Sequence, residues 1–230
     1  NHIAVIMDGN GRWGLKKKKS RNYGHLKGIQ KVETIIKCSL IKKIPYLTLY
    51  TFSTDNWKRP ENEVNFLFDL IRNSLKKKIK KIINQGIKVN IIGKKTGLPK
   101  DIIKVVKLIE NKTSRNKKIT LNLALNYGSK EEIVNACKNL VSKKIKKINT
   151  DTFKNELYTK NIPDPEILIR TGGGKRLSNF LLWQLAYTEI FFLDKMWPDF
   201  NKIDFNKIVK KFYNIKRNFG KIWQIYKKEY

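Results

Sequence analysis

The stretch HIAVIMDGNGRW, residues 2–13, decides how the rest of the chain is interpreted. Its first part, residues 2–7, is an almost wholly apolar run, which predicts a buried β-strand. Asp8 follows at the end of this run, and Gly9 and Gly11 come directly after it. Glycines at such a position let the backbone approach a phosphate group and present its N–H donors. The stretch therefore predicts a strand that ends in an anion-binding turn.

Two further side chains of this turn indicate which anion it binds. The carboxylate of Asp8 is suited to a hard cation, and the planar guanidinium of Arg12 matches phosphate oxygens. Together they predict a site for Mg²⁺ and a diphosphate. Two alternatives stay open: a Gly-rich turn without a ligand, and a dinucleotide fingerprint, since residues 9–14 formally spell G-x-G-x-x-G. The lysine run at 16–19 opposes the fingerprint, because an apolar-faced helix should begin at the glycines.

Outward from this stretch, short apolar runs alternate with segments of helical periodicity. Strands are predicted at 46–52, 87–92, 119–125 and 167–170, and helices at about 26–40, 64–82, 99–110, 131–141, 180–192 and 205–226. This alternation predicts an α/β fold, with a mostly parallel central sheet flanked by helices, in a single domain over residues 1–230. Ligands of such sheets bind beyond the carboxyl ends of the strands.

A second polar motif follows the predicted strand at 46–52. Residues 52–60 read FSTDNWKRP and lead into the longest helical pattern. An ordinary helix start explains Pro60, but it does not explain Ser53 and Asn56. A binding loop and a simple helix start therefore both remain open for this segment.

A third polar motif follows the last predicted strand. Residues 170–179 read RTGGGKRLSN, in which glycines, two arginines and a serine form a second candidate phosphate site. A flexible basic loop is the alternative. The motif is not a P-loop, since Ile169 and Arg176 stand where that motif requires Gly and Ser or Thr.

The charge of the chain limits its partners. Fifty basic and 19 acidic side chains give a net charge of +31. Such a charge indicates affinity for anions. The alternative is drift in an AT-rich coding sequence, which makes Lys, Asn and Ile frequent together, as they are here. Trp13 and Trp57 fall within the polar motifs rather than among basic residues on one face, which disfavours nucleic acid. The basic segment 76–81 is either a peripheral contact for an anionic membrane or a solvated helix face. No apolar run is long enough to cross a bilayer.

Taken in order, these motifs resemble the cis-prenyltransferases, the family of undecaprenyl and dehydrodolichyl diphosphate synthases. The stretches that carry the resemblance are 2–13, 24–25, 52–60, 122–128, 169–173, 176–184 and 197–200. They span nearly the whole chain. The resemblance implies an α/β domain with a parallel sheet and a hydrophobic tunnel lined by the helix at 64–83, and not the all-helical trans-prenyltransferase fold.

The resemblance also implies an activity. Such an enzyme is Mg²⁺-dependent and condenses isopentenyl diphosphate onto an allylic diphosphate, here farnesyl or geranylgeranyl diphosphate. The expected product is a long-chain cis-polyprenyl diphosphate, near undecaprenyl length or somewhat longer, for a dolichol- or polyprenol-type glycosyl carrier lipid. We expect a homodimer, with a second subunit as the alternative, in the cytoplasm or on a membrane, which is the endoplasmic reticulum in a eukaryote. No targeting segment is visible in the sequence.

Residue roles follow from the resemblance as well. Asp8 and Glu189 are the expected metal ligands, and Asp8, His25, Ser53 and Asn56 the expected catalytic residues. The residues expected to bind the two diphosphate substrates are Gly9, Asn10, Gly11, Arg12, Trp13, Arg21, His25, Ser53, Thr54, Asp55, Trp57, Arg59, Arg170, Arg176, Leu177 and Ser178. The competing hypothesis is a non-catalytic partner subunit, which would lack the acid at position 8 and the Ser-x-x-Asn loop.

Three positions depart from the family pattern. Gly174 stands where the family commonly has Glu, and Lys175 stands where some members have a metal-contacting His. Asn218 stands where the best register of residues 217–220 with the family's R-x-G motif puts Arg. These departures bear on a metal or substrate contact and on whether a homodimer suffices, but not on the fold.

Overall fold

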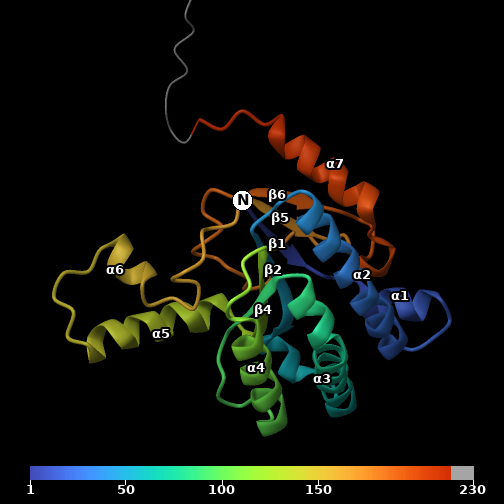
Figure 1. Ribbon diagram of the computed structural model, residues 1–230, viewed down its shortest axis with the longest axis horizontal. Helices are drawn as coiled ribbons and strands as arrows, with labels where there is room; N and C mark the ends of the chain where they lie inside the picture. Colours follow the sequence, from blue (N-terminus) through green and yellow to red (C-terminus); the bar gives the residue numbers. More distant parts are fainter. Residues whose placement is uncertain (219–230) are drawn as a thin grey trace, which may run out of the picture.

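The computed structural model describes residues 1–218 and contains one six-stranded sheet in the order β3-β4-β2-β1-β5-β6 (Figure 1). Every neighbouring pair of strands is parallel. The strands are β1 (His2–Ile6), β2 (Tyr46–Ser53), β3 (Ile87–Ile92), β4 (Ile119–Tyr127), β5 (Ile167–Arg170) and β6 (Glu189–Phe192). The predicted α/β fold with a parallel central sheet is confirmed.

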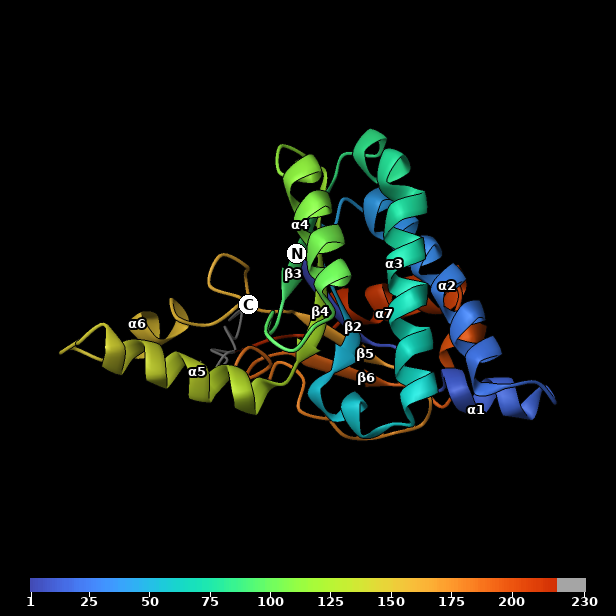
Figure 2. The ribbon, with the colours of Figure 1, turned by 90° about the horizontal axis from the view of Figure 1, so that it is seen from below.

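Seven α-helices and two short 3₁₀ helices accompany the strands in the described part. They are α1 (Asn10–Lys16), α2 (Arg21–Ile41), η1 (Thr54–Lys58), α3 (Glu61–Asn84), α4 (Lys100–Thr113), α5 (Ser129–Ser142), α6 (Thr150–Lys154), η2 (Trp197–Asp199) and α7 (Lys202–Tyr213). Figure 2 shows α2 and α3 side by side over the sheet, whereas α5 and α6 extend away from it. None of the described helices combines the length and the apolar character that crossing a membrane requires.

The two faces of the sheet belong to different apolar layers. In β1, Ile3 and Val5 point into the larger core, while Ala4 and Ile6 point into a smaller one on the opposite face. This period of two is what a strand buried on both faces produces. The larger core holds the inner sides of α2, α3 and α4, and the smaller one holds Tyr127, Phe180 and their neighbours. The apolar pocket described below lies on the side of the larger core.

Three sequence predictions of local structure are wrong. Residues 180–192 are not a helix: Leu181 has a left-handed backbone (φ 47°), and the segment ends in strand β6. The last helix ends at Tyr213, and the predicted continuation falls partly on residues 219–230, outside the described part. A helix does begin at the glycines, since α1 follows the left-handed Gly9 (φ 103°). Apolar content alone did not distinguish these conformations.

Candidate active site

The first cradle, residues 8–12, forms where β1 ends and α1 begins. Gly9 has a left-handed backbone, and a Cβ atom there would lie 2.9 Å from the Cβ of Met196. Position 9 therefore needs glycine for its conformation and for the close approach of the neighbouring loop. Asn10 donates from its side chain to the Met7 carbonyl oxygen at 3.0 Å. The turn predicted from the sequence is thus held rigidly at the end of a buried strand.

Asp8 joins this cradle to the second motif. Its carboxylate accepts from Arg12 Nη2 at 3.2 Å and from Arg170 Nη2 at 2.9 Å. Strands β1 and β5 are neighbours, with Ile6 opposite Arg170, which places the two motifs together. The Asp8 side chain is 28% exposed and that of Arg170 only 3%. One partly accessible carboxylate therefore stands between two guanidinium groups.

The second cradle, residues 170–178, is anchored by the buried Arg170. Its Nη1 donates to Ser178 Oγ at 2.8 Å and to the Arg176 carbonyl oxygen, while Nε has no hydrogen-bond partner among the described residues. Arg176 and Ser178 themselves are exposed, and Leu177 packs against the smaller core. A Cβ atom at Gly174 would lie 2.8 Å from Arg170 Nη2. Glycine at this position therefore lets the loop close over the guanidinium.

A buried carboxylate that the sequence did not single out organises the other side of the first cradle. Glu63, on the first turn of α3, accepts from Arg21 Nε at 2.9 Å and from Arg59 Nη1 at 3.1 Å. Its Oε1 also lies 3.3 Å from His25 Nε2. Burial alone would raise the pKa of Glu63, but the hydrogen bond from Arg21 and the charges of Arg21 and Arg59 lower it below its usual value. Glu63 thus fixes three of the predicted diphosphate-binding residues.

The charge state of His25 follows from the same cluster. Burial and the charge of Arg59 lower its pKa, against the opposing effect of Glu63. His25 is therefore a neutral imidazole at neutral pH. A neutral ring has one donor and one acceptor nitrogen, so it suits a hydrogen bond to a phosphate oxygen better than a Coulombic one.

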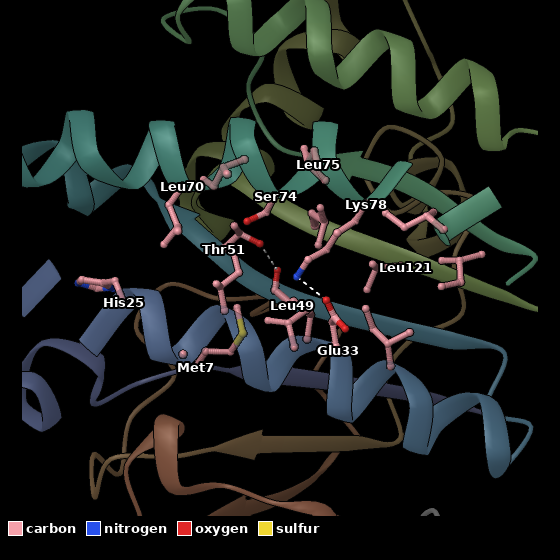
Figure 3. Close-up of a pocket in the computed structure, with 18 of the residues that line it drawn as sticks. Met7, His25, Glu33, Leu49, Thr51, Leu70, Ser74, Leu75, Lys78 and Leu121 are labelled. Carbon is pink, nitrogen blue, oxygen red and sulfur yellow. Dashed lines mark hydrogen bonds and ion pairs between the residues drawn. The ribbon is translucent and has the colours of Figure 1, made fainter. Parts of the chain in front are cut away.

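Two pockets meet at these residues. The polar pocket, a cavity of about 240 Å³, is lined by Met7, Asp8, Gly9, Asn10, Gly11, Arg12, Arg21, His25 and Arg59. The apolar pocket, of about 170 Å³, lies between α2, α3 and the sheet (Figure 3). Met7, Asn10 and His25 line both pockets. The arrangement suits a ligand with an anionic head and a long apolar tail.

Part of the second motif lies near these pockets without lining them. The Ser53 backbone N–H donates to Asn56 Oδ1 at 3.0 Å, which closes the turn after β2. Thr54 faces Glu131, and Asp55 forms an exposed ion pair with Lys58 at 2.7 Å. These contacts fix the turn.

The two predicted tryptophans of the site make structural contacts. Trp57 Nε1 donates to Asn126 Oδ1 at 2.8 Å and its ring packs against Phe52 and Phe68. Trp13 Nε1 donates to Asp199 Oδ1 at 2.8 Å, which ties α1 to η2. Neither side chain lines the polar or the apolar pocket within the described structure.

Glu189, the second expected metal ligand, does not lie beside Asp8 within the described chain. It opens strand β6 opposite Ile167, three residues (about 10 Å) before the level of Arg170. Its carboxylate lies 3.6 Å from Arg217 Nε. Within residues 1–218 no three His, Cys, Asp or Glu side chains converge on a point where a metal ion could bind. Phosphate oxygens and waters are usual further ligands of a magnesium ion held by one carboxylate.

Comparison with known proteins places this site in a family. Residues 6–220 match the family model described as "Putative undecaprenyl diphosphate synthase". The chain is 48% identical to an isoprenyl transferase of Prochlorococcus marinus, over 96% of this chain and 84% of that one. It is 45% identical to an isoprenyl transferase of Clostridium tetani, over 95% and 88% of the two chains.

Two solved structures of prenyl diphosphate synthases have the same fold as this chain. The fold matches lavandulyl diphosphate synthase from Lavandula x intermedia in complex with dimethylallyl diphosphate, with a TM-score of 0.92 and 33% identity over 96% of this chain and 98% of that one. A probable undecaprenyl diphosphate synthase from Campylobacter jejuni matches with a TM-score of 0.82, at the same identity and coverage. The resemblance to cis-prenyltransferases is confirmed, and the chain belongs to the undecaprenyl diphosphate synthase family of isoprenyl transferases.

Proposed function

We propose that this prenyltransferase adds isopentenyl diphosphate units to farnesyl or geranylgeranyl diphosphate in a Mg²⁺-dependent reaction. The product would be a long-chain cis-polyprenyl diphosphate for a polyprenol- or dolichol-type glycosyl carrier lipid. One observation carries the proposal: the basic polar pocket adjoins the apolar pocket, and Met7, Asn10 and His25 line both. A neighbouring structure of the same fold is a complex with dimethylallyl diphosphate, itself an allylic diphosphate.

The two cradles would divide the substrates between them. The first cradle lines the polar pocket, which adjoins the apolar pocket, so it would hold the allylic diphosphate, whose tail grows with each cycle. Backbone N–H groups of Gly9–Gly11 and the guanidinium groups of Arg12 and Arg21 would bind its phosphates. The second cradle carries exposed Arg176 and Ser178 beside the anchored Arg170, and it would hold isopentenyl diphosphate, which has a short tail.

Asp8 fits a role in holding Mg²⁺. Magnesium in phosphate-transferring sites is usually held by one or two carboxylates together with substrate phosphates and waters. Asp8 supplies one carboxylate, partly exposed and placed between the two cradles. When bound, Mg²⁺ would neutralise charge on the departing diphosphate. We also propose Glu189 as a second metal ligand. In the described chain this residue lies away from Asp8, so the two carboxylates do not converge there.

The residues of the chain would assist each bond change. As the allylic C–O bond breaks, negative charge builds on the diphosphate, and Arg12, Arg21 and the backbone N–H groups stabilise it. The isopentenyl double bond then attacks the allylic carbon. A proton leaves the resulting cation to form the new cis double bond, and Ser53 with Asn56 would orient its acceptor.

The experiment that tests this proposal uses the purified chain with radiolabelled isopentenyl diphosphate, farnesyl diphosphate and Mg²⁺. We expect label in an extractable polyprenyl product, resolved by chromatography after removal of the diphosphate, and no product when EDTA removes the metal. Product that forms only after a second subunit is added would contradict a self-sufficient homodimer. Absence of product with every allylic starter and with added partner would contradict the proposed activity.

A further inference from the structure

Three of the four charged side chains that line the apolar pocket form a cluster; the fourth is Lys37. Glu33 on α2 pairs with two lysines of α3: its Oε1 lies 2.6 Å from Lys78 Nζ, and its Oε2 lies 2.7 Å from Lys81 Nζ. All three residues line the pocket, whose other wall residues are mostly apolar. Figure 3 shows the Glu33–Lys78 pair reaching from one helix to the other across the pocket. This set of residues is called the clamp below.

The clamp lies partway along the pocket. Glu33 is eight residues, or about 12 Å along α2, beyond His25 at the polar end. On α3 the lining continues past Lys78 to Ile82 and Gln85, and the start of β3 contributes Ile87. An apolar chain that begins at the first cradle must therefore pass the clamp to enter the far part of the pocket.

The clamp is charged under assay conditions. The hydrogen bonds from Lys78 and Lys81 lower the pKa of Glu33 to about 2. A carboxylate whose pKa is lowered keeps its charge above that value, so the pair is intact at any pH near neutrality. The three side chains are 32%, 32% and 46% exposed, for Glu33, Lys78 and Lys81 respectively. Because the three residues are partly exposed and belong to neither apolar core, single substitutions here should leave the fold intact.

We propose that Glu33, Lys78 and Lys81 determine product length by holding α2 and α3 together across the apolar pocket. The inference rests on the proposed function and refines it. With the clamp closed, the far part of the pocket accepts only the length of chain that fits beneath the joined helices. Room for one more isoprenoid unit would require α2 and α3 to separate. Otherwise the apolar chain would have to contact and desolvate the charged groups of the clamp, which is unfavourable. Elongation therefore stops when the pocket is full.

The test compares product lengths made by the full chain and its variants from radiolabelled isopentenyl diphosphate and farnesyl diphosphate. Glu33→Gln and Lys78→Met should each shift the main product to a longer chain, by at least one isoprenoid unit. Glu33→Lys should shift it further, since it places three like charges together. The double variant Glu33→Lys, Lys78→Glu again has opposite charges on α2 and α3. It should return the product to the wild-type length.

Asp101→Asn is the matched control. Asp101 pairs with Arg72 at 2.5 Å and joins α3 to α4 outside the pocket. This variant removes an ion pair from the same helix and should leave product length and rate unchanged.

The outcomes separate this inference from the proposed function. If the wild-type chain elongates but Glu33→Gln and Lys78→Met give wild-type product lengths, the clamp is overturned while the activity stands. Loss of all incorporation in Glu33→Gln, with Asp101→Asn active, would also overturn it, because the clamp acts on length alone. A shift equally large in Asp101→Asn would show a general loosening of α3 and overturn it as well. Failure of the wild-type chain to elongate any starter overturns the proposed function itself.

Discussion

The two cradles are built from similar residues but held in different ways. Beside the first, Arg21, His25 and Arg59 all contact the buried Glu63, so these three side chains are fixed before any ligand arrives. In the second, Arg170 is buried, but Arg176 and Ser178 are exposed, and Ser178 has a left-handed backbone (φ 51°). Preorganised donors bind an anion with less reorganisation than mobile ones.

This difference matches the separate tasks proposed for them. The allylic diphosphate is anchored by its long tail as well as by its head, and a rigid site can hold it through one condensation. Isopentenyl diphosphate must enter anew in every cycle, and an open loop permits rapid exchange. Asp8 contacts arginines of both cradles and is the link between the rigid side and the open side.

The largest expected effect comes from breaking that link. Asp8→Ala should lower kcat by about a thousandfold, comparable to removing a principal electrostatic group from an active site. Farnesyl diphosphate should still bind, because Arg12, Arg21 and the backbone donors remain. Turnover is measured with radiolabelled isopentenyl diphosphate, and binding by equilibrium titration. Activity like that of the wild type would remove Asp8 from the mechanism.

The positions of Asp8, Ser53 and Arg170 at one edge of the sheet were predictable from the sequence. Each follows a short apolar run, and the carboxyl ends of parallel strands meet at one edge. The strand β6 was not predictable, because residues 180–192 have an apolar content that fits a helix or a strand. The left-handed backbone at Leu181 and the pairing with β5 decide the outcome, and both depend on tertiary contacts.

Glu63 shows a second limit of the sequence. Four residues after Arg59 it resembles an ordinary acidic residue in the first turn of a helix, where the helix dipole favours negative charge. Its importance comes from Arg21 and His25 on α2, which lie 42 and 38 residues earlier in the chain. A pattern within one helix carries no signal of partners that distant. The clamp at Glu33 escaped prediction for the same reason.

The second prediction concerns the effect of acid on the two histidines of the chain. His2 is expected to act on the stability of the fold, and His25 on the substrate site. Burial lowers the pKa of His2, at the far end of β1, to about 4 from 6.5. In the unfolded chain His2 becomes protonated as the pH falls below 6.5. In the folded chain His2 stays neutral until the pH reaches about 4. The free energy of unfolding should therefore fall by about 3 kcal/mol across this window.

Urea unfolding measured between pH 7 and pH 4 checks this prediction, with His2→Gln and His25→Gln as the two variants. The pKa of His25 is lowered too, so it contributes with the same sign. We expect His2→Gln to remove most of the slope, and His25→Gln to act mainly on the KM for the allylic substrate. Equal slopes in His2→Gln and the wild type would contradict the assignment.

The third prediction uses matched glycines, one in each cradle. A Cβ atom at Gly11 would lie 2.7 Å from Arg21 Cζ, and one at Gly174 would lie 2.8 Å from Arg170 Nη2. Overpacking of this kind costs about 1–3 kcal/mol, so a change of about tenfold in KM is expected. Gly11→Ala should raise the KM for the allylic diphosphate, and Gly174→Ala should raise the KM for isopentenyl diphosphate.

The two variants should also differ in size of effect. Arg21 is 44% exposed and bonded to the single carboxylate of Glu63, whereas Arg170 is 3% exposed and held by both Asp8 and Ser178, so it has less room to adjust. Gly174→Ala is therefore expected to have the larger effect. Initial rates with one substrate varied at saturating concentration of the other provide both constants. If both variants raised the same KM, the division of substrates between the cradles would be wrong.

The smallest expected effect concerns the exposed end of α3, far from both cradles. A water-insoluble product that fills the apolar pocket leaves most easily if the enzyme rests on a membrane, and the exposed Lys76, Lys77 and Lys80 suit an anionic lipid surface. One lysine near such a surface contributes about 1 kcal/mol, so Lys77→Gln should weaken binding to vesicles rich in phosphatidylglycerol about fivefold. Lys146→Gln, an equal charge change beyond α5, is the control. Co-sedimentation at several salt concentrations measures both variants; equal losses in the two would mean that net charge, and not the end of α3, governs the contact.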